Sequence, residues 1–191
     1  MLRGMETDMS KLDLDGQLWR FALEFYALPS VAEACLTLQD EAQLDVIQLL
    51  AAIYADLVLQ QPFSLQDVAE LKRQTVEWRG ATVLPLRDIR RFLKPPRDGF
   101  PEERQLLREK VKAAELLAEQ IQLAMTEQWL GRRPPGPGLQ MREVLGLLLV
   151  KDDAAGISRN ERALDIALSA LETAMNLVIR NYDSKGNYIG E

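Results

Sequence analysis

The stretch "LWRFALEFYALPSVAEACLTLQDEAQLDV" (residues 18–46) decides the fold, because it reads as two consecutive helices, of which the first has almost no polar surface. In the first helix Gln17, Arg20 and Glu24 form one narrow polar stripe, and nearly all other positions are apolar. A helix of this kind normally lies at the centre of its fold. Pro29 suits the first turn of the second helix, where no amide donor is needed. We therefore predict an all-α protein without a sheet, folded as a compact bundle of six to eight mostly antiparallel helices.

Aromatic side chains crowd the first of these helices, at Trp19, Phe21, Phe25 and Tyr26. They could line a ligand pocket, dock a partner or belong to the core. The thin polar stripe favours burial of most of these rings against neighbouring helices. Trp19 and Tyr26 remain the candidate pocket residues, since a pocket needs one of them to face a cavity.

Start and stop signals place further helices. Asp45 can cap one of them, and Ser64 with Asp67 makes a capping box for the next. Gly80 is a suitable end for that helix. A shorter helix is expected to follow, with Pro85 near its first turn.

The longer helices lie later in the chain. Pro101 is expected to start a helix that runs to Leu130, and Ser158 with Glu161 predicts the start of the last one. Each carries apolar residues at alternating three- and four-residue spacing, which suits antiparallel packing within a bundle and could also serve a homodimer. The first series is Leu107, Val111, Ala114, Ala118, Ile121 and Met125, and the second is Leu164, Leu168, Leu171, Met175 and Val178.

The segment "GRRPPGPG" (131–138) is the clearest boundary in the chain, because it consists of proline, glycine and arginine alone. It could separate a small domain or only reverse the chain within one bundle. Asp13 or Asp15 is expected to cap the first helix, after a polar leader. The predicted organisation is a flexible leader (1–12), a helical core domain (13–130), the linker (131–138), C-terminal helices packed on the core (139–182) and a tail (183–191).

Composition excludes several kinds of chemistry. The chain has no histidine and one cysteine, Cys35, so it lacks Ser-His and Cys-His nucleophilic pairs, histidine-ligated zinc and an internal disulfide. Cys35 lies among apolar residues and is expected to be a small core residue. Acidic side chains at helix ends are expected to act as caps, so we predict no metal site and no cofactor. An enzyme is not the favoured class, although carboxylates, Lys, Arg and Tyr leave one chemically open.

The net charge of −6 disfavours nucleic acid and anionic membranes as partners. No apolar run approaches the ~18–20 residues of a membrane span, and acidic residues stand where a signal peptide would be apolar. Together with the single cysteine, these features predict a cytoplasmic protein without a membrane anchor.

Charge is unevenly distributed along the chain. Residues 1–71 carry a net charge of −9, whereas residues 72–97 carry +6. Within the basic segment, spacing of i, i+3, i+4 and i+7 places four cations on one face of the expected short helix: Arg87, Arg90, Arg91 and Lys94. Leu86, Ile89 and Leu93 would then form its opposite, apolar face.

The basic face has several interpretations. It could pair with carboxylates of the acidic N-terminal third, at Glu33, Asp40, Glu41 and Asp45, or it could be an ordinary solvated helix face. It could also bind a phosphate, a carboxylate or an acidic protein. Trp78 beside Arg79 could add a stacking platform or only anchor a helix end in the core. The candidate partner- or anion-binding residues are Trp78, Arg79, Arg87, Arg90, Arg91 and Lys94.

Four segments carry a resemblance to a known family: "LWRFALEFYALPSVAEACLTLQDE" (18–41), "DV" (45–46), "VEWRGATVLPLRDIRRFLK" (76–94) and "AAELLAEQIQ" (113–122). They resemble a bacterial family of small proteins labelled only as a domain of unknown function. The Trp-Arg pair followed by Pro-Leu-Arg-x-x-Arg is the most specific part. The family has an asparagine after the Asp-Val pair, where this chain has Ile47. The resemblance implies an intracellular helical protein and no particular activity.

From these features we expect a non-catalytic interaction or adaptor protein, whose basic helix face binds an acidic protein partner or an anionic ligand. The alternative is a small-molecule-binding protein or enzyme, with an aromatic helical pocket and arginines that hold an anionic group.

Overall fold

The computed structural model describes residues 11–94, 99–149 and 161–181. Within these ranges the chain forms eight α-helices and one short π-helical segment, with no strand, so the predicted all-α fold class is confirmed. The elements are α1 (Gln17–Tyr26), α2 (Val31–Ala42), α3 (Val46–Leu57), α4 (Leu65–Trp78), η1 (Arg79–Val83), α5 (Leu84–Phe92), α6 (Pro101–Leu130), α7 (Met141–Leu149) and α8 (Glu161–Asn181).

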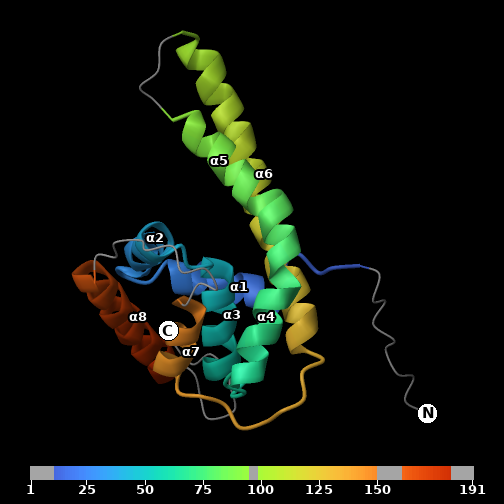
Figure 1. Ribbon diagram of the computed structural model, residues 1–191, viewed down its shortest axis with the longest axis vertical. Helices are drawn as coiled ribbons and strands as arrows, with labels where there is room; N and C mark the ends of the chain where they lie inside the picture. The colour runs from blue at the N-terminus through green and yellow to red at the C-terminus, as the bar shows by residue number, and fades with distance from the viewer. Residues whose placement is uncertain (1–10, 95–98, 150–160, 182–191) are drawn as a thin grey trace.

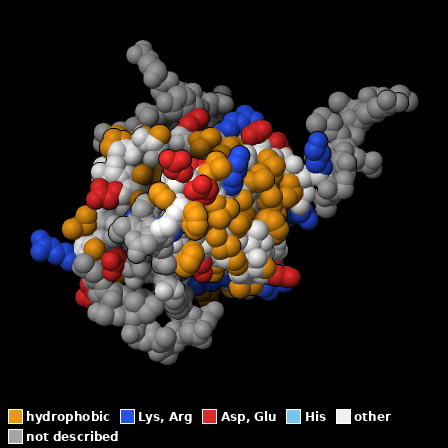
Figure 2. Space-filling model, turned by 90° about the horizontal axis from the view of Figure 1, so that it is seen from above, with side chains coloured by type: hydrophobic (Ala, Val, Ile, Leu, Met, Phe, Trp, Pro, Cys, Tyr) orange, Lys and Arg blue, Asp and Glu red, His pale blue; other side chains and the backbone are white. Residues whose placement is uncertain are grey.

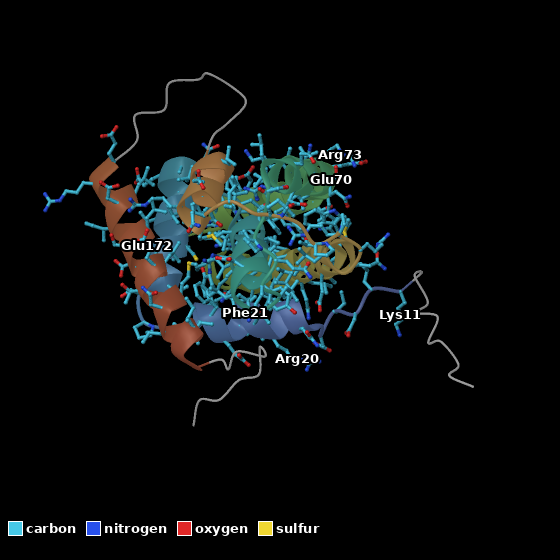
Figure 3. The ribbon with its side chains drawn as sticks, turned by 90° about the horizontal axis from the view of Figure 1, so that it is seen from below. Lys11, Arg20, Phe21, Glu70, Arg73 and Glu172 are labelled. Atoms are coloured by element: carbon cyan, nitrogen blue, oxygen red, sulfur yellow. The ribbon has the colours of Figure 1, made fainter. Side chains whose placement is uncertain are left out.

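The core is built around α3, which is buried along most of its length. Asp45 caps its N-terminus by accepting a hydrogen bond from the Ile47 amide at 3.0 Å, as the sequence predicts. On α1, Phe21 stacks on Phe25 with ring centroids 5.6 Å apart and meets the Tyr54 ring of α3 at 5.3 Å. Figure 3 shows Phe21 on α1, seen from below. The interpretation of the aromatic helix as a core helix is confirmed for these two phenylalanines.

The N-terminus of α1 is capped from a distant part of the chain. Glu127 of α6 accepts hydrogen bonds from the amides of Gln17 at 2.9 Å and Leu18 at 3.2 Å. The prediction that Asp13 or Asp15 caps this helix is therefore wrong. The carboxylate on α6 occupies the space in front of the helix and satisfies amides that a local cap would otherwise serve.

A nearly continuous helical column runs from α4 through η1 into α5 and away from the core (Figure 1). The predicted capping box is present at its start, where the Ser64 and Asp67 side chains each bond the other's amide. The prediction that Gly80 ends this helix is wrong, because the backbone widens there into a π-helical turn and the helical column continues. A π turn inserts extra backbone without breaking a helix. Residues 84–94 and 99–118 form a hairpin that projects from the other helices, and we call it the arm (Figure 1).

The C-terminal helices lie on the body of the protein, away from the arm. Helix α8 lies along α2, and α7 contacts α3 and α4 (Figure 1). Between α6 and α7 the Leu139 amide donates to the Phe63 carbonyl at 2.8 Å. Gly138 lies so close to Pro62 that a Cβ there would stand 2.4 Å from the Pro62 carbonyl oxygen. Ser158 and the predicted tail lie outside the described residues.

The two apolar series have different surroundings. On α8, Leu164, Leu171 and Val178 are buried. On α6, Ala118 is buried, whereas Leu107, farther along the arm, is exposed. The series on α6 therefore runs out of the core onto a surface that nothing in the described part of the chain covers.

Candidate functional site

The inner face of the arm is polar. Arg87 of α5 is only 6% exposed, and its Nε donates to Oε1 of Glu115 of α6 at 2.9 Å. Arg87 also donates to Glu119. Arg90 donates to both carboxylate oxygens of Glu115, with 3.1 Å for the contact from Nη2 to Oε1. These two arginines and two glutamates form one ion-pair group, which we call the arm cluster.

The two carboxylates of the arm cluster differ in their electrostatics. Burial alone would raise the pKa of Glu115, but hydrogen bonds from Arg90 and Arg87 outweigh burial and hold that pKa below its usual range. Burial dominates at Glu119 and raises its pKa in spite of Arg87. The hydrogen bond to Glu115 raises the pKa of Arg90. Glu115 is thus the anchored carboxylate, and Glu119 is the member that takes up a proton more readily.

The base of the arm is fastened by Trp78 and Arg79. The indole Nε1 of Trp78 donates to the Ala118 carbonyl at 3.0 Å. Arg79 Nε lies 3.3 Å from Oδ2 of Asp45, the residue that caps α3. The same Asp45 oxygen accepts a hydrogen bond from Gln122 of α6 at 2.9 Å. These contacts tie η1 to α3 and α6, and the interpretation of Trp78 as an anchor in the structure is the one these bonds favour.

Arg91 and Lys94 are the exposed members of the predicted basic set. Arg91 Nη2 lies 2.5 Å from Oδ1 of Asp40 on α2, and both side chains are about half exposed. Lys94 forms no ion pair within the described residues. Of the four carboxylates expected as internal partners, Asp40 pairs with Arg91 and Asp45 pairs with Arg79. Glu33 and Glu41 form no ion pair in the described part of the chain.

Sequence reasoning missed the main partners of the basic face, Glu115 and Glu119. Their spacing of four residues in "AAELLAEQIQ" places both carboxylates on one face of a long helix. Two carboxylates at i, i+4 facing two arginines at i, i+3 is the signal that could have found the arm cluster. As a binding site for a partner or an anion, the basic face stays a prediction.

Apolar side chains of α5 point away from the protein. The sequence predicts Leu86, Ile89 and Leu93 on the apolar face opposite the cations, and Leu93 is buried and Leu86 half-buried. Ile89, however, is 47% exposed, and Phe92 is 61% exposed. Arg87 and Arg90 of α5 contact α6, because Glu115 lies there. Part of the apolar face of α5 therefore turns outward.

Helix α6, like α5, exposes apolar side chains on its outward side. Large apolar side chains are about half exposed or more along it and at the residue just before it: Leu106, Leu107, Leu116 and Leu117, and Phe100. Figure 2, seen from above, shows hydrophobic side chains gathered at the end of the molecule from which the arm projects, with charged side chains around them. The arm thus encloses the arm cluster and leaves much of its apolar surface outside.

The two candidate pocket residues, Trp19 and Tyr26, lie on α1. Trp19 is partly buried against the core. Tyr26 is 36% exposed, and burial, followed by Cys35 and Glu119, raises its pKa to about 12. An open hollow of about 440 Å³ lies elsewhere, between α4 and α7. It is lined by Leu65, Val68, Ala69, Lys72, Arg73, Val76 and Leu147.

Two further findings concern membranes and metals. No single helix in the described ranges is long and apolar enough to cross a membrane, and only the pair α1 and α2, bent by 99°, reaches that length and composition together. Among the same residues, no cluster of three or more Cys, Asp or Glu side chains is arranged to hold a metal ion.

Comparison with known proteins gives a family. A family model described as "Protein of unknown function (DUF2390)" matches residues 17–126. This range runs from α1 into α6 and contains η1, α5 and the whole arm cluster. Neither the comparison with curated proteins nor the comparison with solved structures found a match. Because the family model covers more than half of the chain, the protein belongs to the DUF2390 family of proteins of unknown function.

Proposed function

We propose that this protein is a non-catalytic interaction protein of the bacterial cytoplasm and that the arm docks a protein partner. One observation carries the proposal: the arm buries the ion pair of Arg87 and Glu115 and exposes large apolar side chains such as Phe92 and Leu106. Apolar surface that a fold leaves exposed in this way is typical of a binding face.

The energetics of the arm support this role. Ion pairs removed from water lose much of their gain to desolvation. Apolar surface left in water forgoes roughly 25 cal/mol per Å². A hairpin with no partner would be more stable with its apolar side chains between the two helices and its ion pairs in water. The observed one becomes favourable when another protein covers the outward faces, while the arm cluster holds α5 and α6 in register.

The predicted basic docking face contributes to this proposal at its exposed end. Arg91 and Lys94 lie near Phe92 on α5 and can flank an apolar contact there. Exposed cations beside an apolar contact favour partners with acidic side chains and speed association. The other four predicted residues are engaged inside the protein, where they hold the arm in place.

The proposal of a cytoplasmic location rests on Cys35 and on the net charge of −6, which disfavours anionic membranes as partners. The single cysteine is a buried free thiol, which suits a reducing compartment. The alternative function, a binder of small anionic molecules, is less well supported, because Arg87 and Arg90 already have carboxylate partners.

Site-specific photo-cross-linking in living cells tests the proposal. A photoreactive amino acid replaces Phe92, Leu106 or, as a control, Ile166 of α8, which is an apolar residue as exposed as the other two. We expect discrete protein cross-links from the two arm positions and none above background from Ile166. Equal cross-linking from all three positions, or none from the arm, would contradict a docking role for the arm.

A further inference from the structure

We propose that the partner of the arm is a second copy of this chain. The α6 helices of the two copies pair antiparallel, and the twofold axis passes between Leu106 and Leu107. This inference rests on the proposed docking role and names the partner. It is carried by the order of charged and apolar residues along the exposed side of α6.

The exposed side of α6 carries a seam with coiled-coil spacing. Its members follow one another at intervals of three, four, three and four residues, and all are exposed: Glu103, Leu106, Lys110, Ala113 and Leu117. This spacing keeps one stripe of a helix facing a neighbouring helix. The seam is distinct from the series through Leu107 and Ala118, which leads into the core.

Charge along the seam is complementary to itself when the helix is reversed. In an antiparallel pair centred between Leu106 and Leu107, Glu103 of one copy faces Lys110 of the other, and the twofold axis repeats the pair. Neither side chain forms an ion pair within the described part of its own chain. At the edge of this pairing Phe100, which is 78% exposed, lies opposite the small side chain of Ala113.

The shape of the molecule permits this register. Gly99, at the tip of the arm, falls opposite Ala114 of the second copy, one turn short of Ala118. Ala118 is covered by Trp78 and marks the beginning of the body. The two arms then overlap over about 24 Å, at a rise of about 1.5 Å per residue. A register shifted by one heptad toward the body would press each tip against the other copy and would separate Glu103 from Lys110.

Sedimentation of the full-length protein at low ionic strength tests the pairing, since salt screens exposed ion pairs. We expect a concentration-dependent dimer. Glu103→Lys or Lys110→Glu alone should weaken dimerisation about tenfold, because the twofold axis makes both charge pairs repulsive at once. The double variant Glu103→Lys/Lys110→Glu restores both pairs and should return the dissociation constant to within about threefold of the original.

Lys112→Glu is the matched control, because Lys112 is exposed on the same helix but lies off the seam. It makes the same charge change as Lys110→Glu and should leave dimerisation unchanged. Circular dichroism melts of every variant verify that the fold is intact. A dimer insensitive to the two single swaps, or single swaps that the double variant does not rescue, would refute the pairing.

The failure of this inference differs from the failure of the docking role. A monomer at all concentrations, with photo-cross-links from Leu106 to a different protein, would overturn the second-copy inference and leave the docking role standing. A monomer without arm cross-links would overturn both. Cross-links from Leu106 between two copies, together with rescue by the double swap, would support both.

Discussion

Arg87 Nε lies 2.9 Å from Oε1 of Glu115, and the two residues are nearly inaccessible to solvent although they belong to a hairpin that projects from the body. Removing one partner of such a pair leaves a buried charge without compensation, which costs far more than the intact pair contributes. The pair therefore specifies how α5 and α6 meet, and it explains why α5 presents Arg87 and Arg90 to α6 and leaves Phe92 outside.

The first prediction compares the two carboxylates of the arm cluster. Glu115→Gln should lower the free energy of unfolding at pH 7 by about 3 kcal/mol, because Arg87 and Arg90 lose their shared counter-charge. Glu119→Gln should cost less than about 1 kcal/mol, because burial already disfavours its charged form. Urea denaturation followed by circular dichroism measures both values. Equal losses in the two variants would contradict this assignment.

The same two variants should show opposite trends with pH. The lowered pKa of Glu115 contributes stability above its ordinary value of 4.5 that is lost as pH falls through the folded-state pKa, so the deficit of Glu115→Gln should shrink in acid. The raised pKa of Glu119 contributes stability below 4.5 that is lost as pH rises through the folded-state pKa. Glu119→Gln should therefore gain on the unmodified protein between pH 4 and pH 7.

Local signals in the sequence predicted local structure well. Asp45, the Ser64–Asp67 capping box and Pro101 each mark a helix start where the structure has one. These devices act between residues a few positions apart, so their outcome is decided before the helices pack. Gly80 failed as a stop signal because contacts from neighbouring Arg79 and Trp78 hold the widened backbone in place.

Long-range contacts were harder to predict. The spacing of Arg87 and Ile89 separates two faces of α5 but does not say which face turns inward. That choice depends on Glu115, which lies 28 residues from Arg87 in the sequence. Glu127 caps α1 from 110 residues away, and no local sequence pattern indicates this cap. The same limit explains why the exposed apolar surface of the arm became visible only with the structure.

The second prediction concerns the approach of the linker to Pro62. Gly138→Ala would place a Cβ 2.4 Å from a backbone carbonyl oxygen, which cannot move away as a flexible side chain would. We expect a loss of about 1–3 kcal/mol in the free energy of unfolding. Gly136→Ala is the control, since a Cβ there meets no atom within 4 Å. The interpretation fails if the two variants unfold at the same denaturant concentration.

The third prediction tests the long-range cap of α1. Glu127→Ala should lower the free energy of unfolding by about 1 kcal/mol through loss of the cap. Gly16→Ala should act through the same interaction, because its Cβ would stand 2.2 Å from the Glu127 carboxylate and displace it. The double variant should be less unstable than the sum of the single losses, since the cap can be lost only once. Strict additivity in a double-mutant cycle would show that the two residues act independently.

The fourth prediction concerns the reactivity of Cys35. The side chain is 0% exposed, and burial raises the pKa of its thiol to about 12, so almost no thiolate is present at pH 8. A disulfide reagent such as DTNB should therefore leave the folded protein unmodified and should react fully once denaturant is added. The reaction rate at intermediate urea should follow the unfolded fraction measured by circular dichroism. Rapid labelling in native buffer would mean that α2 opens without global unfolding, in conflict with the packing of α8 along it.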